Sequence, residues 1–476
     1  MHEIRVSARA GAPQETEADT RVVGLFEGET LPEAALQALV DSGEAKPRLK
    51  HTAVAHADGR RVIVCGLGKR AEFDAERARA AAAAAAARAK ELGARSLSWA
   101  APDGGGTAAA LVEGTLLRLY EFDRFKSKGD DEDERPRIGA VEVVGADADE
   151  VERGRIAAEA ANRARDLQNL PSNVATPEYL AQRALELAAE HDAIEAEAHG
   201  RDWILEQGMG AFAAVASGTE LEPRFIVLRY RGGGQGGHTA FVGKAVTFDT
   251  GGISLKPGAK MHEMKFDMSG GAAVIESIGA IAELGLPVDV TGLVPATENM
   301  PSGHSVKPGD IVTAKNGTTI EVNNTDAEGR LLLADALCHA VDLGAERIVD
   351  LATLTGAIVV ALGSTYAGLF SNDDEWCAEV EAACSATGEL GWRLPLHPEY
   401  AEMVKGQYAD LTNLTAERKA SSITAAEFLR RFVGDTPWVH VDIAGTAWGQ
   451  ARNYVGKGAS GFGVRMLIEL ARRLAR

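Results

Sequence analysis

Hydrophobic runs of strand length alternate with longer segments of helical periodicity through the second half of the chain. The runs predict strands over 224–230, 239–248, 288–296, 347–353 and 438–444. The intervening patterns predict helices over 271–284, 331–341 and 425–432. Strands that alternate with helices in this way form a mainly parallel central sheet covered by helices on both faces. We therefore expect an α/β fold whose ligands bind at the carboxyl ends of the strands.

The first 150 residues show the same alternation on a smaller scale. Strand patterns occupy 21–26 and 61–68, and the alanine-rich stretch 80–87 predicts a helix because alanine has the highest helix propensity. A charged helical stretch over 149–168 ends near Pro171, since proline disfavours helix in the residue before it. The predicted domains are a small N-terminal α/β domain over 1–148, a connecting helix over 149–170 and a larger C-terminal domain over 171–476.

The composition is that of a folded protein rather than a disordered or fibrous one. Hydrophobic residues make up 45% of the 476 positions and charged residues 25%. The net charge of −19 disfavours binding to nucleic acid and to anionic lipid. The N-terminal residues lack the apolar core of a secretory signal, and no apolar stretch is long enough to span a membrane. We expect a cytoplasmic protein without a disulfide framework, because its four cysteines include no CxxC pair.

Two segments concentrate charged residues among glycines at places where strands should end. They contain Lys244, Asp249, Lys256 and Asp267 in the first, and Asp326, Glu328 and Arg330 in the second. Burying four carboxylates and three cations is costly unless the charges pair or bind metal. Carboxylates can hold two divalent cations, and four of them balance two such ions if one lysine binds as a neutral amine of strongly depressed pKa. The residues alone leave two interpretations open, a dimetal site or a buried salt-bridge network.

Other catalytic classes fit the residues less well. His262 and Glu263 resemble the start of a zinc-protease helix motif, but Phe266 stands where the second histidine is required. Cys338 lies on a predicted apolar helix, where a packed core thiol is the simpler interpretation. We expect no catalytic role for His262 or Cys338.

The two charged segments resemble those of a known family, the leucyl (cytosol) aminopeptidases, which are dizinc exopeptidases. The stretch NTDAEGRL at 324–331 is similar to the family's signature octapeptide, and GKAVTFDTGGISLKP at 243–257 is similar to its partner segment. The likeness extends over about residues 165–476. Carried over by position, the resemblance implies five metal ligands: Lys244, Asp249, Asp267, Asp326 and Glu328. Asp249 and Glu328 would bridge the metals, Lys244 and Asp267 would complete the exchange-resistant site, and Asp326 the labile one.

The same resemblance implies how the site would work. A water or hydroxide bridging two Zn²⁺ or Mn²⁺ ions would attack the first peptide bond of a substrate with a free N-terminus. Lys256 and Arg330 would be the catalytic residues that are not ligands, and Arg330 would hold a bicarbonate ion that serves as general base. Met264, Thr353 and the Leu354 backbone would surround the first side chain, preferably leucine or another apolar residue. The family further implies a homohexamer.

Two alternatives and one departure accompany this interpretation. Some bacterial relatives bind DNA, so an accessory role in DNA binding is possible, although the overall acidity disfavours it. A catalytically dead relative should have lost ligands, and none is lost here.

Ser421 and Ser422 stand where many relatives carry two glycines before a helix. Because serine caps helices well, we expect the fold to survive there and the loop to differ, with effects on substrate access or assembly.

Overall fold

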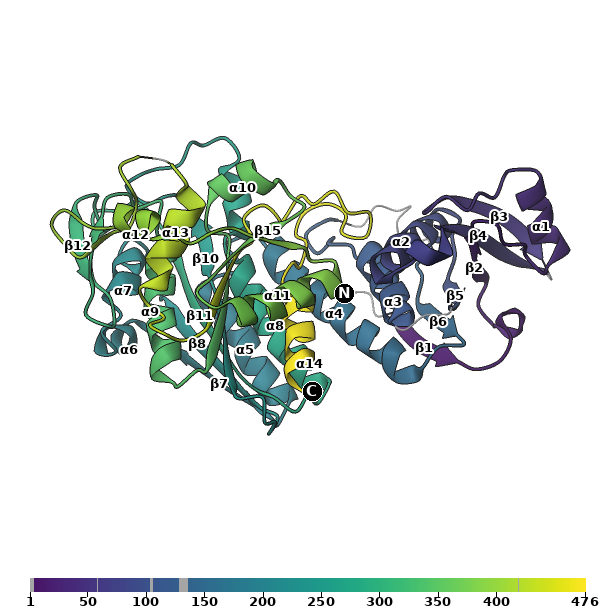
Figure 1. Ribbon diagram of the computed structural model, residues 1–476, viewed down its shortest axis with the longest axis horizontal. Helices are drawn as coiled ribbons and strands as arrows, with labels where there is room; N and C mark the ends of the chain where they lie inside the picture. Colours follow the sequence, from purple (N-terminus) through teal and green to yellow (C-terminus); the bar gives the residue numbers. More distant parts are fainter. Residues whose placement is uncertain (1–3, 58, 103–105, 128–135, 418) are drawn as a thin grey trace. The chain divides into compact units, whose positions relative to one another are not determined.

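The computed structural model describes residues 4–57, 59–102, 106–127, 136–417 and 419–476 (Figure 1). The chain divides into two compact units. The N-terminal unit comprises Met1–Asn162 and Ala451–Gly456, and the C-terminal unit comprises Arg163–Gln450 and Lys457–Arg476. Helix α4 (Ala148–Asn169) covers the stretch in which we predicted a connecting helix. The domain boundaries drawn from the sequence at residues 148 and 170 remain predictions.

The N-terminal unit is built on a six-stranded sheet of order β1-β6-β5-β2-β4-β3, in which all strand pairs are parallel except β3 with β4. The strands are β1 (Arg5–Arg9), β2 (Thr20–Phe26), β3 (Thr52–Ala57), β4 (Arg60–Gly68), β5 (Ser96–Ala100) and β6 (Ala140–Val144), and the helices are α1 (Ala34–Asp41), α2 (Ala75–Glu91) and α3 (Thr107–Leu119). The alanine-rich helix predicted here is α2, which packs closely against α3. A Cβ at Gly114 of α3 would lie 2.2 Å from the carbonyl oxygen of Arg79, so small residues permit this close approach.

The C-terminal unit contains a nine-stranded sheet of order β16-β15-β18-β14-β9-β11-β8-β7, with β10 also paired to β11. Its strands are β7 (Ile194–His199), β8 (Arg224–Arg231), β9 (His238–Gly243), β10 (Ala245–Asp249), β11 (Asp289–Asn299), β14 (Arg347–Ala352), β15 (Ala367–Ser371), β16 (Gly391–Arg393) and β18 (Trp438–Asp442). The centre of the sheet is parallel, since β11 pairs in parallel with β10 and β9, β9 with β14, and β14 with β18. At one edge β8 pairs antiparallel with β11, and β7 pairs antiparallel with β8. The predicted α/β fold with a mainly parallel central sheet is confirmed.

Helices cover both faces of this sheet (Figure 1). One face is packed by α5 (Pro177–Glu190), α8 (Ser269–Glu283), α11 (Asp374–Thr387) and α14 (Val464–Leu474), and the other by α7 (Gly210–Ala216), α9 (Gly329–Asp342) and α13 (Ser421–Arg430). The remaining elements are α6 (Arg201–Glu206), α10 (Gly356–Leu362), α12 (Pro398–Met403) and a small sheet of β12 (Asp310–Thr313), β13 (Thr319–Val322) and β17 (Leu411–Thr412). Among the described residues, no helix combines the length and the apolar character needed to cross a membrane.

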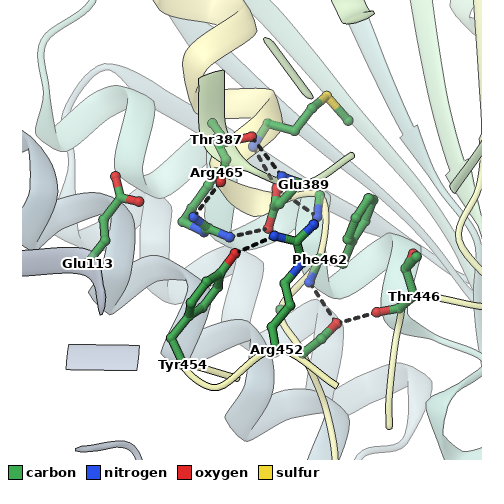
Figure 2. A network of polar contacts seen from close by, with 12 residues as sticks. Glu113, Thr387, Glu389, Thr446, Arg452, Tyr454, Phe462 and Arg465 are labelled. Atoms are coloured by element: carbon green, nitrogen blue, oxygen red, sulfur yellow. Dashed lines mark hydrogen bonds and ion pairs between the residues drawn. The ribbon is translucent and has the colours of Figure 1, made fainter. Parts of the chain in front are cut away.

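A buried carboxylate distant in sequence caps the last helix, α14. Glu389 accepts hydrogen bonds from the backbone N–H groups of Gly463 and Met466, at 3.1 and 2.8 Å, in the first turn of the helix. Arg465 lies 3.5 Å from the same carboxylate and donates to the carbonyl oxygen of Thr387, as Figure 2 shows. A carboxylate at this end satisfies free N–H groups and complements the helix dipole.

Two local differences from the sequence prediction bear on the site. The strand predicted over 239–248 is divided at Lys244 into β9 and β10. The Lys244 N–H still bonds to Leu351 of β14, but its carbonyl oxygen accepts from Gly271 of α8, and beyond it β10 pairs only with β11. The serines expected to cap the helix near 423 lie inside its first turn, since α13 begins at Ser421 after Ala420, whose φ is 49°. The capping prediction was therefore wrong, and the serine side chains are available for other contacts.

Candidate metal centre

The charged residues singled out in the sequence come together at the carboxyl ends of parallel strands. Lys244 directly follows β9, and Asp249 is the last residue of β10. Asp267 ends the short helix η3 (Met261–Phe266), and Asp326 and Glu328 immediately precede α9. Parallel strands bring their carboxyl ends to one edge of a sheet, which is where α/β folds bind ligands. The five predicted ligands therefore share one site.

Three carboxylates converge at the centre of this site. Asp249, Asp326 and Glu328 each offer an oxygen atom, and these atoms all lie within 4.8 Å of one another. Asp249 and Glu328 are buried, whereas Asp326 is partly open to solvent. Burial raises the pKa of Asp249, and the negative charge of Glu328 raises it further. Oxygen ligands held together against their mutual repulsion suit hard divalent cations, so the donor set fits the implied metals.

Two lysines join these carboxylates to one another. The Lys244 ammonium lies 2.8 Å from oxygens of both Asp267 and Glu328. The Lys256 ammonium lies 2.8 Å from Asp249 and 2.5 Å from Asp326. Burial alone would lower the pKa of Lys244, but the surrounding carboxylates outweigh it and raise the pKa. With these carboxylates as its neighbours Lys244 holds its proton, and a divalent cation beside it would favour the neutral amine.

Asp267 connects the charged cluster to the residues expected to line a substrate pocket. Its Oδ1 accepts hydrogen bonds from Lys244 Nζ at 2.9 Å and from Thr353 Oγ1 at 2.7 Å. Burial raises the pKa of Asp267 to about 8. Leu354 follows Thr353 in the chain, and Met264 lies half-buried in η3, which leads to Asp267. The structure thus places these three predicted pocket residues on segments that adjoin the cluster.

Arg330 lies in the first turn of α9 and is buried. One of its terminal nitrogens donates to the carbonyl oxygen of Asn413 at 2.6 Å, while Nε has no hydrogen-bond partner among the described residues. Burial lowers the pKa of Arg330 to about 10, against the opposing effect of Glu328 and Asp442. A buried cation with an unused donor fits the binding of a small anion.

Sequence reasoning missed Asn299, which supports the cluster from the end of β11. Its side-chain amide donates to Asp249 Oδ1 at 2.8 Å and to the carbonyl oxygen of Thr325 at 3.0 Å. Asp249 Oδ1 also accepts the N–H of Gly251, whose φ of 87° and crowded Cβ position favour glycine. The strand predicted over 288–296 stopped short of Asn299. A polar residue closing an apolar strand was the signal that could have identified it.

The two residues set aside as catalytically unimportant lie apart from these contacts. Cys338 packs among buried apolar residues of the core on α9, and burial raises the pKa of its thiol to about 12. His262 is exposed on η3. A thiol of such high pKa is a poor nucleophile at neutral pH.

Comparison with known proteins gives the family. Residues 162–468 match the catalytic domain of the cytosol aminopeptidase family, and residues 22–129 match its N-terminal domain. The chain is 45% identical to a probable cytosol aminopeptidase of Roseiflexus castenholzii, over 98% of this chain and 99% of that protein. It is also 45% identical to one of Solibacter usitatus, over 96% of both. The solved structure of the bottromycin maturation enzyme BotP in complex with Mn superposes with a TM-score of 0.89 at 36% identity, covering 96% of this chain and 100% of that one. The chain therefore belongs to the cytosol aminopeptidase family of peptide hydrolases.

Proposed function

We propose that this protein is a dimetal aminopeptidase that removes the first residue of peptides, preferably leucine or another apolar residue. The observation that carries the proposal is the convergence of Asp249, Asp326 and Glu328 within 4.8 Å, at the strand edge where such folds bind ligands. The family supports aminopeptidase activity in general. The preference for leucine and the use of two metals are the finer parts of the proposal.

The proposed ligands divide into two sets. Asp249 and Glu328 would be shared by both metals, Lys244 and Asp267 would complete the tighter site, and Asp326 the more exchangeable one. Two Zn²⁺ or Mn²⁺ ions held there would polarise the peptide carbonyl and lower the pKa of a water between them. The more open position of Asp326 supports its assignment to the exchangeable site, since its side chain is 34% exposed against 3% for Asp249 and for Glu328.

Two cations would assist catalysis without serving as metal ligands. Lys256, whose ammonium contacts Asp249 and Asp326, would donate to the carbonyl oxygen and stabilise the negative charge that develops there. Arg330 would hold a bicarbonate ion with its unused Nε donor, and that ion would accept the proton of the attacking water.

Recognition of the free N-terminus would make the enzyme an exopeptidase. The α-amino group would bind at the position served by Lys244 and Asp267, so a blocked amine could not dock. The first side chain would lie against Met264, Thr353 and the Leu354 backbone. An apolar pocket of this kind discriminates only modestly among leucine, methionine and similar residues.

The proposal includes a cytoplasmic location and a homohexameric assembly, both by analogy with the family. An accessory role in DNA binding is the second candidate. The net charge of −19 disfavours it, and a gel shift that weakens steeply with salt would support it.

The direct test compares leucine p-nitroanilide with its N-acetyl form, using protein supplied with Zn²⁺ or Mn²⁺. Cleavage of the free-amine substrate alone is expected. Equal cleavage of both substrates would contradict recognition of the amine, and cleavage of neither by folded, metal-supplied protein would refute the aminopeptidase assignment.

A further inference from the structure

A fully buried carboxylate that the proposed mechanism does not use lies at the end of β18. Asp442 Oδ1 accepts the backbone N–H groups of Leu354, Thr355 and Ala444 at 3.2, 3.4 and 3.2 Å. Its Oδ2 accepts the Thr355 hydroxyl at 2.6 Å. A carboxylate is costly to bury, and these four donors compensate for the water it has lost. Three of the four belong to Leu354 and Thr355.

The Thr355 hydroxyl extends this arrangement to helix α13. A hydroxyl has one proton, and the short contact to Asp442 shows where that proton goes. Its oxygen then accepts, both from the N–H of Ile358 at 3.3 Å and from the buried Ser422 hydroxyl at 2.7 Å. With Asp442 ionised, the hydroxyl protons are therefore donated from Ser422 to Thr355 and from Thr355 to Asp442. We call these three residues the Ser422 relay.

The segment held by the Ser422 relay also contacts the proposed metal ligands. Thr353, the residue before Leu354, accepts a hydrogen bond from Lys244 Nζ through its carbonyl oxygen at 3.1 Å. Its hydroxyl donates to Asp267 at 2.7 Å. The backbone of 353–355 is thus held on one side by the charged cluster and on the other by buried hydroxyls and a carboxylate. Loss of either set of contacts would remove side-chain restraints on the position of this segment.

We infer that the Ser422 relay positions the 353–355 segment and thereby sets the discrimination among first residues of the substrate. Asp442, Thr355 and Ser422 are positioning residues, since they act through the Leu354 backbone and not on the substrate itself. The inference rests on the proposed function for its link to substrate, whereas the placement of the segment rests on the hydrogen bonds alone.

The test uses variants of the full chain that remove one hydroxyl each. Ser422→Ala and Thr355→Val remove links of the relay, Thr355→Ser keeps the Thr355 hydroxyl, and Ser421→Ala is the matched control on the neighbouring residue. The measured quantity is the ratio of kcat/KM for leucine and alanine p-nitroanilides, because a loss of folded enzyme cancels from that ratio. We expect Ser422→Ala and Thr355→Val to change the ratio by about threefold to tenfold. Thr355→Ser and Ser421→Ala should preserve it.

Hydrogen exchange provides a readout that does not need activity. Faster exchange of the amides of Leu354, Thr355 and Ile358 is expected in Ser422→Ala and Thr355→Val, and not in Ser421→Ala. An unchanged substrate ratio in an active Ser422→Ala enzyme would overturn the link to specificity, even if Thr355→Val fails to fold. Unchanged exchange would overturn the positioning role. If the wild-type protein cleaves neither substrate, the proposed function fails, and the exchange measurement still decides the positioning role.

Discussion

The side-chain amide of Asn299 donates a 2.8 Å hydrogen bond to Oδ1 of Asp249, so a neutral residue at the end of β11 orients a proposed bridging ligand. Residues that orient metal ligands affect metal affinity by about 10-fold to 100-fold. We predict a loss of this size in Asn299→Ala, measured by calorimetric titration with Zn²⁺ or Mn²⁺. Asn316→Ala, at an exposed turn, is the matched control. Equal affinities in the two variants would mean that Asn299 is only a structural residue.

Replacement of Glu328 should separate metal binding from the salt-bridge interpretation. Glu328→Gln keeps the shape of the side chain but removes the charge that contacts Lys244 at 2.8 Å. We predict that metal bound per chain falls and that kcat/KM drops by more than about 100-fold, since a ligand should matter more than a residue that orients it. The control is Asp310→Asn at the start of β12, which removes an ion pair with Lys307 outside the metal cluster. It should leave both quantities unchanged. Full metal content and activity in Glu328→Gln would exclude Glu328 as a ligand.

Much of the fold and of the charged cluster could be predicted from the sequence. The buried parallel strands have continuous apolar patterns, and the charged residues stand out among glycines at their ends. The break between β9 and β10 at Lys244 could not be predicted from the sequence, because both strands are apolar. They differ only in their pairing, since β9 pairs with both β11 and β14, whereas β10 pairs with β11. The antiparallel direction of β8 was equally hidden, since an apolar run does not show which way its strand runs.

The supporting polar residues were harder to predict than the charged ones. Asn299, Thr355 and Ser422 are common polar residues whose roles arise from tertiary contacts. Ser422 meets Thr355 across 67 positions of the chain, and Thr355 meets Asp442 across 87. Local pattern carries no information about such pairs.

Acid should destabilise the protein partly through His339. The ring lies edge-on to Trp203 and Phe225, and burial lowers its pKa from 6.5 to about 4. The unfolded chain therefore binds the proton more readily between these values, and stability is lost as pH falls from about 6.5 toward 4. The melting temperature of His339→Phe should fall less between pH 7 and pH 5 than that of the wild type, whereas exposed His262→Gln should follow the wild type. Parallel pH profiles for all three proteins would disprove the assignment.

The cap on α14 should contribute strongly to stability. Glu389→Ala leaves two helix N–H groups without their acceptor and Arg465 without its carboxylate, at a cost of about 3 kcal/mol. The matched control is Glu379→Ala on α11, which removes a solvent-accessible ion pair with Arg473 of α14. This change should cost less than about 1 kcal/mol. Thermal unfolding of the two variants measures the difference. Similar melting temperatures would show that Glu389 is not a significant cap.

Reconstitution of chelator-treated protein tests the dimetal assignment most directly. Zn²⁺ or Mn²⁺ is added in steps to protein of known concentration, while bound metal and cleavage of leucine p-nitroanilide are followed together. We predict no cleavage before addition, uptake of two ions per chain at a site that Glu328→Gln weakens, and activity that rises to a plateau as the second ion binds. Cleavage by metal-stripped protein, or a folded chain that takes up no metal, would contradict the proposal that this carboxylate cluster is a dimetal peptidase centre.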